Sequence, residues 1–332
     1  MQIDIENGKR FNEEPAISAV SSGNDIVLVR LANGTGVKAL SLSALRDFVA
    51  GDLTALTTED KTSVVAAVNE LLVDIGADRD RLDDLEDLTA ILEYNNAGLH
   101  NALYRGKYLG DALTAEQSAA IRAGTFEDLY IGDYWTINSI DYRIADFDYF
   151  YGSGDTECTT HHIIVVADQC LDVDQKMNDS NVTTGGYTGS KMYTTYMATA
   201  KNKVVSAFGS GHVLSHREYL CNAVSNGRPS GGAWFDSTSE LMSEAMVYGG
   251  SFFEPTSDGS TVPAKYSVAY KQLNLFRHRP DLIIAKNSGT RKWYWLRNVV
   301  SGTHFALVGT DGTANYGTAS GASGVRLASP IY

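Results

Sequence analysis

Cysteine is scarce in this chain of 332 residues and occurs at Cys158, Cys170 and Cys221. The number is odd and no two cysteines form a CxxC pair, so the sequence predicts neither a disulfide framework nor a zinc knuckle. We expect three reduced and largely buried thiols, because a free cysteine packs as a small apolar side chain. No cofactor and no bound metal are expected.

Long apolar segments and basic charge are lacking as well. The apolar run 163–167 is far too short to span a bilayer, and the first residues contain no basic or apolar secretory signal. Asp and Glu outnumber Lys and Arg by 40 to 27, for a net charge of −13. This charge repels phosphate groups, so nucleic acid and membrane surfaces are poor candidate partners and membrane insertion is not expected. A protein of this kind that acts outside a cell leaves it by lysis or within a particle.

Aromatic residues are plentiful, with 18 Tyr, 11 Phe and 4 Trp, so the chain can bury a substantial core. The sequence patterns predict an α+β protein with three zones. Residues 1–53 form a small β-hairpin and helix collar, residues 54–103 a helical oligomerisation stalk, and residues 104–332 one mixed domain.

The collar is indicated by two β-rich runs, 26–31 and 35–40, which flank a turn at Ala32-Asn33-Gly34. A short amphipathic segment, 42–49, follows them. The unit is too small to be stable alone, so we expect it to dock on copies of itself or on another protein.

The stalk is predicted as a helix that Thr57 or Thr58 caps, with Glu59 and Asp60 in its first turn. Alternating steps of four and three residues give a mostly apolar seam, which favours a coiled coil. The alternative is a single amphipathic helix lying on the globular domain. The seam positions are Val64, Val68, Leu71, Ile75, Asp78, Leu82, Leu85, Thr89 and Leu92.

The run from Leu56 to Leu71 resembles a segment that recurs in phage tail-fibre proteins, where a "T-x-x-K-T-x-L-V-x-A-I-N-E-L" pattern begins a helical stalk. Here the pattern reads LTTEDKTSVVAAVNEL. The resemblance covers about sixteen residues and implies an oligomeric fibre protein located in the virion tail tip.

The mixed domain contains many short elements. The runs Tyr130–Ile137 and Tyr142–Tyr149 alternate like paired strands, and His162–Ala167 is typical of a buried strand. Met192–Phe208 and Ser239–Val247 have helical spacing.

The C-terminal residues resemble the end of C-type-lectin-like domains related to formylglycine-generating enzymes, "W-W-L-R-S … F-x-x-V-x-x-x-G … G-V-R-P". They are more similar still to the terminal region of proteins that phage and bacterial retroelements diversify, several of which are trimeric receptor-binding proteins. Leu327 departs from the pattern, where Pro is usual. The matching residues are Trp295, Leu296, Arg297, Phe305, Ala306, Val308, Gly312, Gly324, Val325 and Arg326.

The resemblance implies a homo-oligomer, expected to be a trimer, whose terminal loops bind a host-surface protein or glycan and whose N-terminus docks on other tail proteins. More than half of the residues from Asn298 to Ser323 are Gly, Ser, Thr, Asn or Tyr, a mix suited to a binding surface. The alternative is an ordinary set of polar β-turns. We expect the exposed receptor-binding set to be Tyr294, Asn298, Thr303, His304, Thr310, Asp311, Asn315, Tyr316, Thr318 and Ser323.

Catalysis has weaker support in the sequence. No cysteine follows Cys221, so the thiols of formylglycine-generating enzymes are missing. No Gly-x-Ser-x-Gly elbow is present. Asp146 and Asp148 would lie on one side of a strand and could form a glycosidase-like pair, which is weak evidence in an acidic protein.

Metal sites have little support too. His212 and His216 have the i, i+4 spacing of a helical zinc site, but Val213 stands where a zincin has Glu, so a structural role is favoured. The adjacent pair His161-His162 would point to opposite faces of a strand. A calcium-dependent lectin would need Asn in the string Glu254-Pro255-Thr256.

The sequence is therefore interpreted as a non-enzymatic phage receptor-binding protein. Two alternatives stay open, a tailspike that degrades host polysaccharide and a purely structural fibre or baseplate component.

Overall fold

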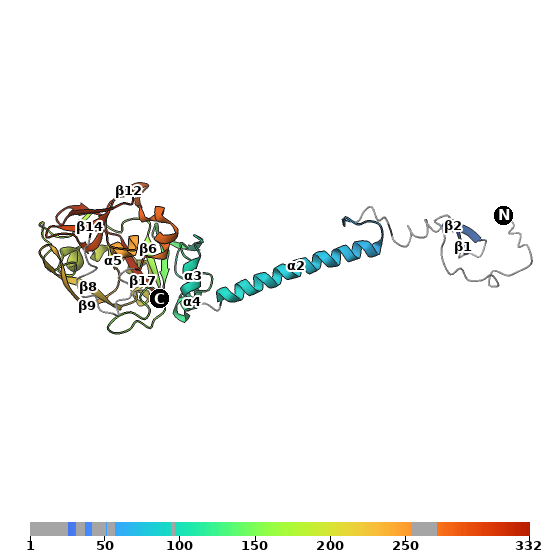
Figure 1. The fold of residues 1–332 in the computed structure, drawn as a ribbon, viewed down its shortest axis with the longest axis horizontal. Helices are drawn as coiled ribbons and strands as arrows, with labels where there is room; N and C mark the ends of the chain where they lie inside the picture. The colour runs from blue at the N-terminus through green and yellow to red at the C-terminus, as the bar shows by residue number, and fades with distance from the viewer. Residues whose placement is uncertain (1–25, 31–36, 42–50, 52–56, 94–96, 254–270) are drawn as a thin grey trace, which may run out of the picture. The chain divides into compact units, whose positions relative to one another are not determined.

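The computed structural model of the protein describes residues 26–30, 37–41, 51, 57–93, 97–253 and 271–332 (Figure 1). The chain forms two compact units, Met1–Leu88 and Thr89–Tyr332. Helices and strands are mixed along the second unit, so the predicted α+β class is confirmed.

In the first unit, β1 (Ile26–Arg30) and β2 (Val37–Ser41) pair as an antiparallel hairpin. The register places Ile26 opposite Ser41 and Arg30 opposite Val37. The predicted hairpin is therefore confirmed, while the expected segment 42–49 lies outside the described residues.

The long helix α2 spans Val64–Glu93 and starts later than predicted. The Ser63 hydroxyl accepts a hydrogen bond from the Ala66 N–H at 3.0 Å and caps the helix in place of Thr57 or Thr58. The Glu70 carboxylate accepts from the N–H groups of Glu59 and Asp60, each at 2.7 Å. These bonds hold the two acids in a turn before the helix, so the predicted start was wrong.

The apolar seam of α2 is exposed in the single chain. Its large side chains are between 45% and 62% exposed, which leaves them available to a partner. The exposed apolar members of the seam are Val64, Val68, Leu71, Ile75, Leu82 and Leu85, and the polar member Asp78 is exposed as well. A coiled coil stays a prediction.

A six-stranded mixed sheet forms the centre of the second unit, in the order β10-β17-β6-β5-β4-β3. Adjacent strands are antiparallel except for β3 and β4. The strands β6 and β17 are distant in the sequence and lie side by side (Figure 1). The strands are β3 (Tyr108–Gly110), β4 (Tyr134–Ile137), β5 (Ile140–Phe147), β6 (Ile163–Ala167), β10 (Glu240–Leu241) and β17 (Leu327–Ile331).

Every residue of β6 and of β17 is buried. Both faces of these strands are covered, which explains why β6 is a continuous apolar run rather than an alternating one. The predicted buried strand at 162–167 is thus confirmed.

The two strands predicted to pair with each other over 130–137 and 142–149 also form and pair, but their ends differ from the prediction. The strand β4 starts at Tyr134 because the Asp133 carboxylate accepts hydrogen bonds from the N–H groups of Lys107 and Tyr130, each at 2.8 Å, and holds a turn. The strand β5 ends at Phe147 because Asp148 takes a positive φ of 54°, which breaks the extended backbone.

The helix expected over 192–208 is divided in the structure. A π-helical turn, η3 (Met192–Tyr196), precedes α5 (Ala198–Phe208), and the Met197 N–H donates to the Met192 carbonyl at 3.1 Å. The extra residue in that turn explains the division, since an i→i+5 bond cannot continue an α-helix.

The helix expected over 239–247 is shorter than predicted. Glu240 and Leu241 pair with β17 in β10, and α6 (Glu244–Tyr248) begins where the Ser243 hydroxyl accepts from the Met246 N–H. A capping serine in extended conformation separates strand from helix.

Short elements complete the second unit. The helical ones are α3 (Ala97–Ala102), α4 (Ala115–Ala123), η4 (Ser210–His212), α7 (Asn274–His278) and η5 (Pro280–Ile283). The strand pairs are β7 (Gln175–Lys176) with β16 (Ala322–Ser323), β8 (His216–Ser225) with β9 (Arg228–Ser237), and β11 (Ala285–Asn287) with β12 (Thr290–Lys292). A three-stranded antiparallel sheet has the order β13-β14-β15, with β13 (Tyr294–Val299), β14 (His304–Val308) and β15 (Ala314–Thr318).

Candidate functional site

The sheet β13-β14-β15 and the connections between its strands carry nine of the ten sequence-predicted binding residues, and β15 is its outer strand. All six residues of β13 are buried, whereas Tyr316 and Thr318 of β15 are exposed and Gly317 between them is half-buried. One strand thus belongs to the core, and the outer strand presents alternate side chains to solvent.

The non-glycine residues of this region that match the lectin-like pattern, which we call the frame, are buried. Trp295 is 1% exposed and its indole N–H donates to the Gln175 carbonyl at 2.8 Å. Phe305, Val308 and Val325 are each 0% exposed. These residues, which match the lectin-like pattern, are therefore part of the core of the terminal fold.

Two arginines of the frame are buried with different partners. The Arg326 guanidinium donates to the carbonyl oxygens of Ala167, Ile283 and Leu282 at 2.7, 2.9 and 3.1 Å. Arg297 instead forms an ion pair with Glu218, with 2.5 Å between Nη1 and Oε1. A guanidinium has five N–H donors in one plane and can bind several carbonyl oxygens at once, as Arg326 does here, whereas the single ammonium of a lysine could not replace it.

Three residues of the predicted exposed set are buried, so their assignment to the surface was wrong. Tyr294, Asn298 and Ser323 are 0%, 3% and 8% exposed. The Tyr294 hydroxyl donates to the Ile283 carbonyl at 2.9 Å, and burial raises the pKa of this phenol to about 12. Ser323 lies in β16, opposite Gln175 of β7. Both faces of β13 are covered, so its side chains do not alternate between core and solvent and Tyr294 and Asn298 are buried.

The other seven residues are exposed or half-buried, and they are spread along the hairpin β14–β15 from its turn, through Tyr316 in the middle of β15, to the opposite end. Thr310 and Asp311 belong to the turn between the strands, where the Asp311 carboxylate accepts from Thr313 N–H and Oγ1–H at 3.1 and 2.7 Å. His304 pairs with Thr318 at the opposite end. Five-residue strands place the two ends roughly 13 Å apart. The exposed members are Thr303, Asp311, Tyr316 and Thr318, and the half-buried ones are His304, Thr310 and Asn315.

Tyr316 is the centre of an aromatic group that we call the Tyr316 cluster, comprising Phe253, His304 and Tyr316. Tyr316 is 49% exposed. Its ring centroid lies 5.4 Å from that of His304 and 5.2 Å from that of Phe253, in edge-to-face geometry at 84° and 74°. These contacts fix the orientation of the ring while leaving half of the residue exposed to solvent.

Two hydroxyl groups lie within hydrogen-bond distance of one imidazole nitrogen of this cluster. His304 Nδ1 lies 2.7 Å from Thr303 Oγ1 and 3.0 Å from Ser301 Oγ. The sheet therefore presents an aromatic face beside adaptable hydrogen-bonding groups.

Phe253 was missed by the sequence reasoning, and buried polar groups hold it in place. Glu244 is 0% exposed, and its carboxylate accepts from the N–H groups of Phe252 and Phe253 at 3.1 and 3.2 Å. The Glu244 N–H in turn donates to the Asn298 side-chain oxygen at 2.7 Å. The adjacent phenylalanines after two glycines were the available signal in the sequence.

The catalytic alternatives do not assemble into one site. Asp146 is buried, with Lys271 Nζ at 3.2 Å and Asn274 Nδ2 at 2.9 Å from its oxygens. Asp148, which follows β5, accepts instead from the His162 N–H at 2.9 Å and contacts His161 Nδ1 at 2.7 Å. The expectation that the two acids share one side of a strand was wrong.

The spaced histidines also differ from the helical arrangement considered above. His212 ends the short helix η4 and His216 begins β8, so the two do not share a helix. Residues 254–256, the nearest match to a calcium-lectin motif, lie outside the described residues.

Within the described part of the chain, no group of three or more His, Cys, Asp or Glu side chains is placed to hold a metal ion.

Among the described helices, none combines the length and the apolar character that crossing a membrane requires.

Comparisons of the chain with protein-family models, with curated proteins and with solved structures find no match.

Proposed function

We propose that this chain is the receptor-binding protein of a bacteriophage or prophage tail fibre, with a non-catalytic, C-type-lectin-like head that attaches the particle to a host-surface protein or glycan. The observation that carries the proposal is the exposed Tyr316 cluster on the outer strand β15. A rigid aromatic ring with a hydroxyl, bordered by Ser and Thr, is the composition of binding hot spots.

The frame beneath this surface supports the same role. The positions that resemble the lectin-like pattern, such as Trp295, Phe305 and Arg326, are buried, while Tyr316 and Thr318 face solvent. A division between fixed anchors and outward side chains lets one scaffold present a specific surface.

The stalk adds avidity to the proposed attachment. We infer that the exposed seam of α2 is buried in a parallel coiled coil between copies, as a trimer by resemblance to tail-fibre proteins. Several heads on one fibre convert weak single contacts into stable attachment. The N-terminal segment would then dock on other tail proteins of the virion.

Binding of the purified full chain to host cells tests the proposal. Tyr316→Ala should weaken binding by roughly tenfold or more, as expected for an aromatic hot spot. Tyr108→Ala is the matched control, because Tyr108 is 52% exposed on β3, at the edge of the six-stranded sheet. Unchanged binding by the Tyr316 variant would place the receptor site elsewhere.

Two further outcomes separate the alternatives. Release of sugar from host capsule by the wild-type chain would support a depolymerase and contradict the non-catalytic head. Absence of any binding to host cells would favour a structural fibre component.

A further inference from the structure

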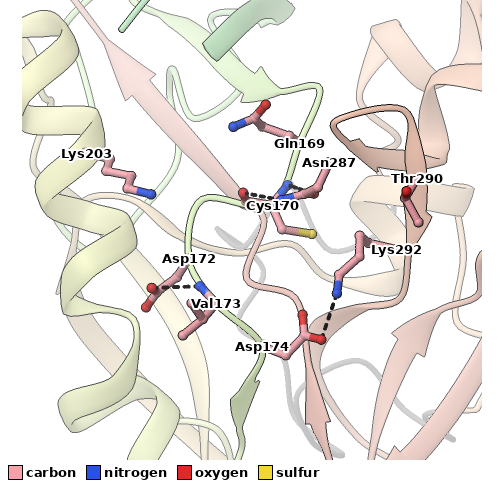
Figure 2. A pocket seen from close by; sticks show the side chains of 9 residues that line it. All are labelled: Gln169, Cys170, Asp172, Val173, Asp174, Lys203, Asn287, Thr290 and Lys292. Atoms are coloured by element: carbon pink, nitrogen blue, oxygen red, sulfur yellow. Dashed lines mark hydrogen bonds and ion pairs between the residues drawn. The ribbon is translucent and has the colours of Figure 1, made fainter. Parts of the chain in front are cut away.

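A solvent-open pocket of about 570 Å³ lies between α5 and the β11–β12 hairpin (Figure 2). Lys203 reaches it from α5 on one side, and Thr290 and Lys292 reach it from β12 on the other. Cys170 and Asp172, in the loop that follows β6, lie between them. The pocket is within the size range of about 300–1,000 Å³ that small-molecule sites occupy.

The floor of the pocket is preformed. The Asn287 side chain accepts from the Cys170 N–H at 3.0 Å and donates to the Cys170 carbonyl at 3.2 Å, clamping the loop to the β11–β12 hairpin. The Leu171 N–H donates to the Val325 carbonyl at 2.7 Å. Gly324 packs so closely on Cys170 that a Cβ there would lie 2.3 Å from Sγ. A ligand would therefore meet an ordered surface and lose little free energy in ordering the loop.

The charges that line the pocket balance. Lys292 is paired with Asp174 at 2.8 Å, and Lys203 and Asp172 supply one further charge of each sign. Burial raises the pKa of Cys170 to about 11, so its thiol is neutral at physiological pH. No excess of either sign favours an ion, and the net charge of −13 opposes a polyanion.

Several lining groups retain hydrogen-bonding capacity. Within the described residues, no side-chain hydrogen bond or ion pair is found for Gln169, Lys203 or Thr290, and all three border the pocket. Asp172 accepts from the Val173 N–H at 2.8 Å and from the Gln175 amide at 3.2 Å, which leaves acceptor sites on a two-oxygen carboxylate. The pocket thus offers ammonium and amide donors together with carboxylate and hydroxyl acceptors.

We propose that this pocket binds a neutral sugar residue without a metal ion. Each sugar hydroxyl donates and accepts at once, so the hydroxyls of one sugar can accept from the Lys203 ammonium and donate to the Asp172 carboxylate, with Gln169 and Thr290 serving further hydroxyls. The site goes beyond the proposed function, because none of its lining residues belongs to the Tyr316 cluster. The chemical class of ligand is a neutral hexose or N-acetylhexosamine.

The test is saturation-transfer NMR and calorimetry on the full chain with D-glucose, D-galactose and N-acetyl-D-glucosamine, each in the presence of EDTA. We expect at least one of them to bind with a dissociation constant in the range of about 1 mM. D-glucuronate should bind more weakly than the neutral sugar of the same shape. No binding of any of the three neutral sugars at about 50 mM, or preference for glucuronate, would overturn the proposal.

Matched variants locate the binding. Lys203→Met and Asp172→Asn should each weaken sugar binding by about tenfold, the worth of a hydrogen bond to a charged group, without changing the melting temperature. Lys286→Met and Asp111→Asn are the controls, because both residues are exposed and neither lines the pocket. Sugar binding that survives both pocket variants would assign it to another surface. Host-cell binding by these variants, measured separately, distinguishes failure of this site from failure of the proposed receptor role.

Discussion

The side-chain oxygen of Asn298 accepts the N–H of Glu244 at 2.7 Å, deep in a site where Asn298 is 3% exposed. Glu244 uses its carboxylate to hold the backbone of Phe252 and Phe253. Because Phe253 packs against Tyr316, a buried amide in β13 helps to position an exposed ring in β15. Asn298 thus helps to position the exposed Tyr316 ring although it is itself buried.

Replacing Asn298 with Ala should damage both stability and the Tyr316 cluster. A buried N–H that loses its acceptor costs about 1–3 kcal/mol, so urea unfolding should show a loss of that size. Asn202→Ala, at an exposed position in α5, is the control and should change stability by less than about 0.5 kcal/mol. Equal stability of the two variants would show that the Asn298 contact contributes little.

Gly317→Ala should destabilise the second unit although the change adds one methyl group. A Cβ at this position would lie 2.8 Å from Leu307 Cδ2 and 2.9 Å from Trp295 Cη2, inside van der Waals contact. Overpacking of this kind costs about 1–3 kcal/mol. Gly211→Ala meets nothing within 4 Å and serves as the control in thermal unfolding. A melting temperature for the Gly317 variant equal to that of the control would contradict the packing argument.

The buried pair Glu218–Arg297 should make stability depend on acid pH. Burial by itself would raise the pKa of Glu218, but attraction to Arg297 and a contact with His216 outweigh it and lower the pKa from 4.5 to about 2. The ionised carboxylate therefore stabilises the fold fully above pH 4.5, and this contribution is lost as the pH falls towards 2.

Urea unfolding at a series of pH values measures this dependence. Glu218→Gln should lose several kcal/mol at pH 7, about 3–5 for a broken buried pair, and should show a flatter pH dependence between 4.5 and 2. Glu127→Gln, at an exposed position, should retain the wild-type curve. Parallel curves for wild type and the Glu218 variant would contradict the assignment of the acid dependence to this carboxylate.

The stalk prediction is tested by light scattering on the full chain. We expect a stable oligomer at micromolar concentration, and the double change Leu82→Asp and Leu85→Asp should dissociate it, because unpaired carboxylates are disfavoured in an apolar seam. Val73→Asp is the control, since Val73 is 72% exposed and lies outside the seam. A wild-type monomer would rule out the coiled coil.

The parts of the fold that follow from local pattern were predictable. The apolar run of β6 and the β1–β2 hairpin each depend on a few neighbouring residues. The anchors Trp295 and Arg326 were found through a sequence resemblance and are buried as expected. Local chemistry and a matching motif were sufficient for these elements.

The site could be predicted only in part, because burial on both faces of a strand depends on contacts far along the chain. Alternation placed Tyr294 and Asn298 on the surface, but Ile283 and Glu244 meet their polar groups inside the protein. Phe253 joins Tyr316 through a loop whose position depends on the Glu244 carboxylate. A one-dimensional pattern contains none of these long-range partners.

The outer strand β15 has an evolutionary consequence. Its two exposed positions, Tyr316 and Thr318, flank Gly317, whose size the Trp295 ring restricts. Replacement of the outward side chains changes what the protein presents without disturbing the core, whereas the intervening glycine must stay. Substitutions at Tyr316 and Thr318 can therefore accumulate at little cost in folding, whereas position 317 is restricted to glycine by its neighbours.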